Sequence, residues 1–442
     1  MTRDLNLNVR RKPALGKIGQ MLVIFALFLT VLMLFVGLGV DLGFAFITKA
    51  QLSKAVDAAA LAGMSNFYLG GDTASNIAAG TFSANFAPGG AKPGYVTAMP
   101  VPQINFGTDA QGNQTLTVSA TAVINTFFIR VLPQWKTLAI GDTGQATRAK
   151  VIMTLVLDRS GSMDPGCSGT DCTQGGLYLP SAVANFINVF EDNFDEAAMV
   201  SFASTAVTNV AMQTPFKDAI TTAASSLSWV GGTFSHGGLT NALAINNAVA
   251  VPTNQNAIKV VVFFTDGQAN MIQNSLSCSG TATWNFGGWE SNDVTIGFWS
   301  PSAPNTCAGQ ICPTHINSGS YIGCSGATCA PSACSPALFP SIAGTNLTMN
   351  TTHIVLESEA RCIQVANQMR AAGMYVYCIG LNSAGGVNVP NATFLQEVAN
   401  DPASPTYNSN QPSGEALVTG NGAQLTQLFQ QIAGDIVLRL TY

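Results

Sequence analysis

An uncharged apolar run near the N-terminus, Met21 to Val40, constrains this chain more than any other feature. It reads MLVIFALFLTVLMLFVGLGV, and Thr30 is its only polar side chain. A helix of that length rises about 30 Å, the thickness of the hydrocarbon core of a bilayer, and satisfies its own backbone hydrogen bonds in lipid. A buried core helix and a cleaved signal peptide are the alternatives, but the apolar region of a signal peptide spans only about 7–15 residues. We therefore predict a membrane-spanning helix.

Charges flank this run unequally. Residues 1–17 form a basic tail, and residues 41–57 carry balanced charges. The basic side chains of the tail, opposed only by Asp4, are Arg3, Arg10, Arg11, Lys12 and Lys17. Because basic residues are retained on the cytoplasmic side, the N-terminus is expected in the cytoplasm and everything after the span outside it.

Residues 41–64 are rich in alanine and lack proline, so the helix is expected to continue as an amphipathic stalk. The order of elements over residues 18–64 resembles the N-terminal segment of TadG-like proteins of tight-adherence (Flp) pilus assembly. The residues that carry the resemblance are Gly19-Gln20, the apolar run, Gly39-Val40-Asp41-Leu42-Gly43 and Gln51 to Ala62. The resemblance implies a single-pass protein of the bacterial inner (cytoplasmic) membrane with a periplasmic or other extracytoplasmic C-terminal domain. A type IV pilin-like segment would have a glutamate shortly after its processing glycine. No glutamate precedes Glu191 in this sequence, so a processed pilin subunit is not expected.

Composition excludes two classes of protein. Hydrophobic residues make up 47% of the 442 residues and charged residues only 9%, whereas a disordered chain has low hydrophobicity and many charges. The net charge of −5 does not provide the basic surface that a nucleic-acid-binding protein needs. No nucleic-acid partner is expected.

Residues 65–150 are predicted to form a small β-rich linker module. Thr115 to Ile124 alternates and favours β-branched residues, as strands do. A turn is expected over residues 109–113, with Ile104 to Gly107 as the partner strand. A further strand is indicated by Thr137 to Ile140 and Thr143 to Arg148. No chemical constellation occurs here, so the module is interpreted as a spacer.

Residues 151–442 show the pattern of a doubly wound α/β domain. Three continuous apolar runs, typical of buried parallel strands, alternate with helix-like stretches: Val151 to Leu157, Ile258 to Thr265 and Met374 to Leu381. Shorter strands are expected at Ala197 to Phe202 and Val207 to Met212. In such sheets ligands bind beyond the carboxyl ends of the strands.

Oxygen-bearing side chains stand at those ends. The first run is followed by Asp158-Arg159-Ser160-Gly161-Ser162, the second by Asp266-Gly267, and Gly231-Gly232-Thr233 lies between them. Two carboxylates and three hydroxyls are hard ligands of modest charge, suited to Mg²⁺ that keeps some of its waters. The alternative is a serine-rich turn that caps the next helix.

This set resembles the von Willebrand factor A (vWA) domain and its metal-ion-dependent adhesion site (MIDAS). The resemblance implies a Rossmann-like fold over residues 151–442 that binds Mg²⁺, or Mn²⁺ or Ca²⁺. It makes Ser160, Ser162 and Thr233 direct ligands, whereas Asp158 and Asp266 would hold metal-bound waters or the ligand hydroxyls. Thr240 is a weaker candidate than Thr233, and Asp164 and Ser235 are expected to be solvated loop residues.

A cysteine-rich insertion is expected at about residues 270–350. Its cysteines are Cys278, Cys307, Cys312, Cys324, Cys329 and Cys334, and another pair, Cys167 and Cys172, follows the first metal loop. The spacing allows zinc, but an oxidising extracytoplasmic compartment favours disulfides, whose connectivity the sequence does not decide. Cys362 and Cys378 either pair with each other or are apolar core thiols. Trp284, Trp289 and Trp299 are either exposed anchors for a partner or fill the loop's own core.

These observations favour a non-enzymatic, membrane-anchored protein of pilus assembly or adhesion. It is expected to bind a protein partner, a pilus or other cell-envelope component, that supplies an acidic residue to the metal. One alternative is a structural membrane tether with a purely structural metal. Another is a hydrolase, for which His236 is the only histidine near the site, but nucleophile and metalloprotease motifs are absent from the sequence.

Overall fold

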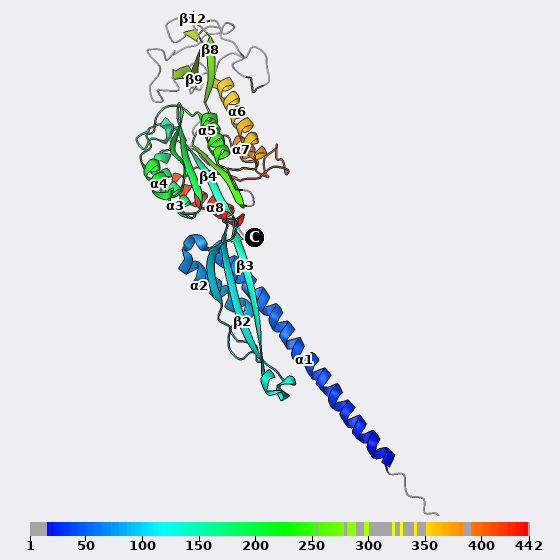
Figure 1. Cartoon of the computed structure of the whole chain (residues 1–442). Coiled ribbons are helices and arrows are strands. Elements are labelled where there is room, and N and C mark those ends of the chain that lie inside the picture. Colours follow the sequence, from blue (N-terminus) through cyan, green and yellow to red (C-terminus); the bar gives the residue numbers. More distant parts are fainter. Residues whose placement is uncertain are drawn as a thin grey trace, which may run out of the picture. The chain divides into compact units, whose positions relative to one another are not determined.

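The computed structural model divides into two compact units (Figure 1). The first comprises residues 1–66, 71–107 and 115–146, and the second comprises residues 67–70, 108–114 and 147–442. The residues that the structure describes are 16–252, 255–277, 281–288, 296–299, 321–322, 328–329, 340–342, 351–382 and 390–440.

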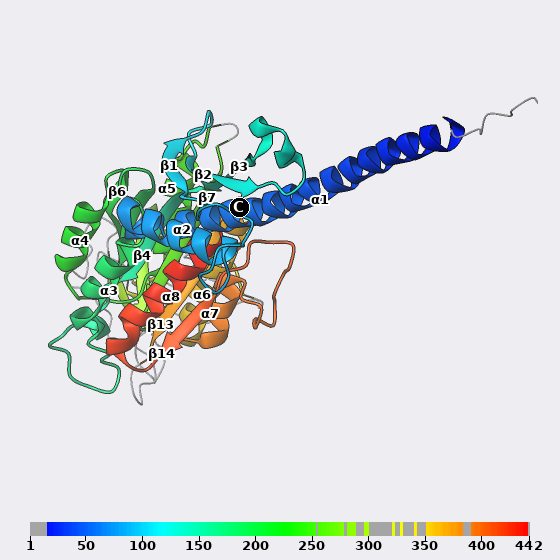
Figure 2. The ribbon, with the colours of Figure 1, turned by 90° about the horizontal axis from the view of Figure 1, so that it is seen from below.

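A single long helix, α1 (Gly16–Ser65), runs through the first unit (Figure 2). It contains the apolar run, whose side chains from Met21 to Val36 are all exposed, and it continues without a break into the predicted stalk. Its most apolar window has a mean hydropathy of 2.9, so the helix is long and apolar enough to cross a membrane. The prediction of one continuous N-terminal helix is confirmed.

The stalk packs against a second helix, α2 (Gly71–Phe86), which we did not predict. The buried side chains of α2 recur at every fourth residue: Ala74, Ala78, Phe82 and Phe86. This spacing places them on one face of a helix, and that face packs on the stalk at Gly63, where an added Cβ would lie 2.9 Å from the Cβ of Ala78. The helical period was therefore present in the sequence, but the small and polar residues between these positions obscured it.

A three-stranded sheet completes the first unit, in the order β1-β2-β3. Its strands are β1 (Gln103–Thr108), β2 (Gln114–Asn125) and β3 (Thr137–Arg148). The predicted turn forms where the Asp109 carboxylate accepts hydrogen bonds from the N–H groups of Gln111 (2.9 Å) and Asn113 (2.8 Å). The two segments predicted after Thr137 form one uninterrupted strand.

The second unit is built on a six-stranded sheet in the order β14-β13-β7-β4-β5-β6. All neighbouring strands are parallel except β5 and β6, which are antiparallel. The strands are β4 (Lys150–Asp158), β5 (Glu196–Phe202), β6 (Ala206–Gln213), β7 (Ala257–Thr265), β13 (Tyr375–Leu381) and β14 (Ala416–Thr419). Every strand predicted for the doubly wound domain of residues 151–442 is present, and the doubly wound fold is confirmed.

Helices cover both faces of this sheet (Figure 1). One core contains residues of α3 (Leu179–Ile187), α4 (Lys217–Ser225) and α8 (Leu425–Leu438). The other contains residues of α5 (Ser235–Ala248), α6 (Thr351–Ala371) and α7 (Ala392–Ala399). Side chains of β4 alternate between them, since Leu155 and Leu157 enter the first core and Val156 the second.

The insertion adds short antiparallel strands. One sheet, in the order β10-β9-β8, contains β8 (Met271–Ser277), β9 (Thr281–Gly288) and β10 (Ile296–Trp299), and β11 (Tyr321–Ile322) pairs with β12 (Thr328–Cys329). The predictions for the side chains of this insertion lie outside the described residues. They concern Cys278, Cys307, Cys312, Cys324, Cys329, Cys334, Trp284, Trp289 and Trp299.

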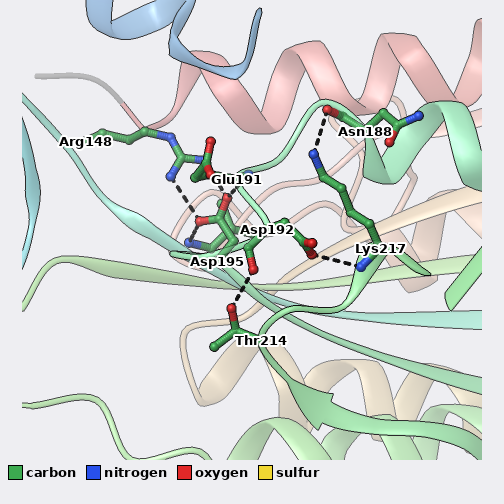
Figure 3. A network of polar contacts seen from close by, with 8 residues as sticks. Arg148, Asn188, Glu191, Asp192, Asp195, Thr214 and Lys217 are labelled. Carbon is green, nitrogen blue, oxygen red and sulfur yellow. Dashed lines mark hydrogen bonds and ion pairs between the residues drawn. The ribbon is translucent and has the colours of Figure 1, made fainter. Parts of the chain in front are cut away.

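A buried polar network secures the amino-terminal edge of the six-stranded sheet (Figure 3). The carboxylate of Asp195, which precedes β5, accepts two hydrogen bonds from the guanidinium of Arg148, at 3.0 and 2.6 Å. It also accepts bonds from the backbone N–H groups of Val151 and Glu191, both at 2.8 Å. These contacts hold the start of β4 beside the start of β5, so the two strands end together at the opposite edge.

Candidate metal centre

The two neighbouring central strands β4 and β7 end side by side. Leu157 pairs with Phe264 in the parallel ladder, so Asp158 and Thr265 emerge together at the carboxyl edge. The Thr265 hydroxyl donates to Asp158 Oδ2 at 2.6 Å, and Asp158 Oδ1 accepts from the backbone N–H of Ser160 at 2.8 Å. Asp158 is fully buried and therefore shapes the loop that follows it.

Three of the predicted residues converge above this carboxylate. Ser162 Oγ donates to Asp266 Oδ1 at 2.9 Å, and Ser160 Oγ lies 3.3 Å from the same oxygen. The two serine hydroxyls are 3.1 Å apart. Ser160 and Asp266, which are 106 positions apart in the sequence, thus bring their oxygens together because each follows a central parallel strand.

The loop before α5 brings Thr233 to the same place. Gly231 has φ of +80°, and a Cβ there would overlap the Ser204 hydroxyl, so this position requires glycine. Its carbonyl accepts from the N–H of Gly161 at 3.0 Å, which ties the two loops together. The Thr233 N–H donates to Asn270 Oδ1 at 2.8 Å.

These loops surround a cavity of about 360 Å³. Ser160, Ser162 and Thr233 line it, together with Asn270 and both cysteines of the Cys167–Cys172 disulfide. The cavity therefore gathers the three hydroxyls proposed as direct ligands, while the two carboxylates lie buried beside them.

Electrostatics of the site favour an added positive charge. Burial raises the pKa of Asp158, and burial together with the nearby charge of Asp158 raises the pKa of Asp266. Two carboxylates in a desolvated site destabilise each other when both are ionised. A divalent cation held by the adjoining hydroxyls would compensate both charges, so the donor set fits Mg²⁺ or Mn²⁺.

The candidate centre does not contain a cluster of histidine, cysteine and acidic side chains among the described residues. Among the described residues, no group of three or more His, Cys, Asp and Glu side chains could hold a metal. The candidate centre instead combines hydroxyls with two carboxylates, all of them oxygen donors.

Three residues support the site that we did not single out from the sequence. Thr265 and Asn270 bond to Asp158 and to the Thr233 N–H, and the Thr173 hydroxyl donates to Asp266 Oδ2. Thr265 could have been found, because it directly precedes Asp266 at the end of a predicted strand. Thr173 and Asn270 lie in loops whose paths the sequence pattern does not define.

The other candidates near the site occupy different environments. The prediction that Ser235 is solvated is wrong, because it begins α5 and is buried. Thr240 donates its hydroxyl to the carbonyl of His236 at 2.6 Å within the same helix, and Asp164 accepts from the N–H of Gly166 at 2.8 Å. His236 does not line the cavity and is buried, and burial lowers its pKa to about 3.

The remaining cysteines of the described residues resolve an open alternative. Cys362 on α6 and Cys378 on β13 are both free and buried. They belong to the same apolar core, so they are core thiols and not a disulfide. Burial raises the pKa of both, which keeps them protonated.

Two known protein families match separate parts of this chain. The Flp pilus-assembly TadE/G-like family matches residues 19–66, and the von Willebrand factor type A domain family matches residues 153–283. The chain thus carries a TadE/G-like N-terminal segment and a vWA domain, as the sequence motifs predicted. No curated protein matches the chain.

Solved structures show more distant similarity. The pilus adhesin SpaC from Lactobacillus rhamnosus GG is 14% identical, with a TM-score of 0.38 over 77% of this chain and 35% of that chain. The vWF domain of the type V pili tip protein Mfa5 from Porphyromonas gingivalis is 15% identical, with a TM-score of 0.40 over 66% and 97%. Proximal thread matrix protein 1 from the mussel byssus, with a zinc-occupied MIDAS motif, is 13% identical, with a TM-score of 0.34 over 66% and 46%. Similarity at this level has no bearing on what this chain binds.

Proposed function

We propose that this chain is a non-enzymatic, membrane-anchored protein of pilus assembly or adhesion that binds a partner protein through a divalent cation. The observation that carries the proposal is the convergence of Ser160, Ser162 and Thr233 on one cavity beside two buried carboxylates. The TadE/G-like segment and α1 fit a membrane anchor. The basic tail supports an inner-membrane location with the vWA domain outside the cytoplasm.

A bound divalent cation would supply a Lewis-acidic position for a carboxylate of the partner. The chain's own part is orientation. Asp158 holds the Ser160 backbone, Asp266 accepts from the two serine hydroxyls, and Gly231 holds the loop that presents Thr233. The side chain of Asn270 fixes the Thr233 backbone by accepting a hydrogen bond from its N–H group. The cavity leaves room for an acidic side chain to enter from outside.

Metal binding itself is the first test. Isothermal titration of the full chain in detergent with Mn²⁺ or Mg²⁺ should detect a site, and Ser160→Ala should weaken it about 10–100-fold. Thr240→Ala is the matched control, because that hydroxyl is bonded within α5 and should leave the affinity unchanged. Equal affinity for Mn²⁺ in wild type and Ser160→Ala would disprove the site.

Partner binding is the second test. Crosslinking in cells followed by identification of the captured proteins should recover an envelope or pilus component that is lost with Ser162→Ala or after metal chelation. Unchanged capture in chelator, with the metal site confirmed by titration, would favour the structural-tether alternative. Normal pilus assembly by Ser160→Ala and Ser162→Ala variants would favour it as well.

Hydrolysis is the less favoured function. His236 is buried, is absent from the cavity lining and stays neutral at physiological pH because its pKa is lowered to about 3. A hydrolytic activity of the purified chain that disappears in His236→Ala would overturn this assignment.

A further inference from the structure

The connection between β2 and β3 exposes a cluster of large apolar side chains. This connection, which we call the β2–β3 tip, comprises residues 126–136 and reads TFFIRVLPQWK. Five large apolar side chains of the tip are between 44% and 77% exposed to solvent: Phe127, Phe128, Val131, Leu132 and Trp135. A contiguous apolar patch of this kind marks an interaction surface.

Hydrogen bonds give the β2–β3 tip a defined shape. Thr126 Oγ1 donates to the carbonyl of Trp135 at 2.6 Å, and the Thr126 N–H donates to the carbonyl of Lys136 at 3.2 Å. Between these residues the chain forms two short 3₁₀ turns, η2 (Ile129–Val131) and η3 (Pro133–Trp135). The apolar side chains are therefore presented by a built loop that is closed at its base.

Contacts with α1 fix the depth of the tip along that helix. The Asp41 carboxylate accepts from the backbone N–H groups of Phe127 (2.7 Å), Phe128 (3.0 Å) and Ile129 (2.8 Å). A Cβ at Gly37 would overlap the Phe128 side chain. The tip thus lies level with the last turn of the apolar run, which ends at Val40, and Gly37 is about 5 Å inside that end.

We infer that the β2–β3 tip inserts into the lipid surface beside α1 and forms a second membrane contact of the protein. The inference rests on the proposed membrane anchor, because α1 sets the position of the bilayer. Aromatic side chains such as Trp135 favour the interface between lipid and water. Arg130 and Lys136 border the apolar side chains and can reach the lipid phosphates while their stems lie along apolar surface.

Lipid fits this surface better than a protein partner because the patch is continuous with the anchor. The exposed side chains of α1 at the same level, such as Leu38 and Val40, are those that the bilayer would cover. An ion pair between α1 and the hairpin lies farther out, where Lys49 pairs with Asp142 at 2.8 Å, about 12 Å beyond Asp41 along the helix. The hairpin therefore changes from polar to apolar in step with α1.

Fluorescence quenching by brominated lipid tests the inference. The full chain is reconstituted into phosphatidylcholine vesicles with or without bromine on the acyl chains, and the Trp135 signal is taken as the difference between wild type and Trp135→Phe. We expect brominated lipid to quench this signal at least twofold. The signal of Trp229, obtained in the same way with Trp229→Phe, should be unaffected because that side chain is partly buried and packs against a hydrophobic core.

Paired variants separate the tip from the anchor. Gly37→Leu should reduce the quenching of Trp135 because the new side chain displaces Phe128, whereas Gly39→Leu should not, since no atom lies within 4 Å of its added Cβ. A double substitution, Val131→Asp with Leu132→Asp, should also reduce it. Val101→Asp is its control, because Val101 is an exposed valine of the same unit outside the tip.

Flotation of the vesicles distinguishes the two possible failures. A chain that floats with the vesicles but shows an unquenched Trp135 signal keeps its anchor and overturns the inference. An unquenched Trp135 signal in the wild-type chain, together with loss of a crosslinked envelope protein in the double aspartate variant, would identify the tip as a protein interface and overturn the inference too. A chain that does not float at all overturns both the anchor and the inference.

Discussion

His236 illustrates how burial controls a single ionisable residue of the vWA domain. Its ring packs against Phe234 with centroids 4.5 Å apart, and its Nδ1 has no hydrogen-bond partner among the described residues. Burial, together with the charge of Arg361, lowers its pKa from 6.5 to about 3. Below pH 6.5 the unfolded chain therefore binds a proton that the folded chain does not, and stability falls as the pH decreases toward 3.

Between pH 6.5 and pH 5, His236 should lower the free energy of unfolding of the wild type by about 2 kcal/mol, at about 1.4 kcal/mol per pH unit. We predict that His236→Gln does not show this loss. The measurement is the free energy of unfolding of wild type and variant, by chemical denaturation, at a series of pH values. Identical pH profiles would show that the pKa of His236 is the same in the folded and the unfolded chain.

Glu359 provides a control of the opposite sign. Burial and the charge of Glu397 raise its pKa to about 7, so its contribution to stability is full below pH 4.5 and is lost as the pH rises toward 7. Glu359→Gln should therefore remove a decline of stability with rising pH. If both variants shifted the profile in the same direction, the two burial effects would not be the cause.

At the scale of elements, Asp195 joins the starts of β4 and β5 through the network of Figure 3. Its carboxylate is buried, as is the Arg148 guanidinium that it binds. Asp195→Ala would leave a buried cation and two backbone N–H groups without their acceptor, so we predict a loss of about 3–5 kcal/mol in the free energy of unfolding. Urea denaturation measures it.

The matched control lies at the same edge of the sheet. Glu196 forms an ion pair with Lys150 at 2.6 Å, but both side chains are partly exposed to solvent. Glu196→Ala should cost about 1 kcal/mol or less. A similar loss in both variants would mean that charge pairing, independent of burial, stabilises this edge.

The loop between η4 (Gly161–Met163) and η5 (Gly175–Leu177) links a disulfide to the candidate metal centre. The Cys167–Cys172 bridge is followed directly by Thr173, whose hydroxyl bonds to Asp266. Replacing both cysteines by serine should lower the free energy of unfolding by about 2 kcal/mol, from the entropy of a short closed loop. It should also weaken Mn²⁺ binding in calorimetric titration, because Thr173 is held less firmly. Unchanged affinity would show that Thr173 keeps its place without the bridge.

Elements differ in how well the sequence revealed them. Apolar runs such as Val151 to Leu157 identified the central strands, because a strand buried on both faces leaves no alternative pattern. The edge arrangement of β6 and the helix α2 needed tertiary packing to be recognised. The proximity of Asp158 and Asp266 was predictable because strand ends meet at one edge. Thr173 was not, because its loop is shaped by a disulfide and by contacts between residues far apart in the sequence.

At the scale of the whole molecule, two features of the sequence and structure predict on which side of a membrane the vWA domain lies. Disulfide formation at Cys167 and Cys172 is compatible with an oxidising compartment, and the basic tail favours the cytoplasm. These two features lie on opposite sides of the apolar run. They support the same orientation independently, so the orientation can be tested by changing one of them alone.

We predict that alkaline phosphatase fused to the C-terminus of the full chain is active in bacterial cells, whereas green fluorescent protein fused there is dark. Substituting Arg10, Arg11 and Lys12 by glutamate should lower phosphatase activity severalfold, because it removes the excess of basic residues that retains the tail in the cytoplasm. Substituting Lys49 and Lys54 by serine is the control and should preserve the activity, since those lysines lie beyond the span. Fluorescence of the C-terminal fusion in the unsubstituted chain would place the metal centre in the cytoplasm and exclude a role in binding partners outside it.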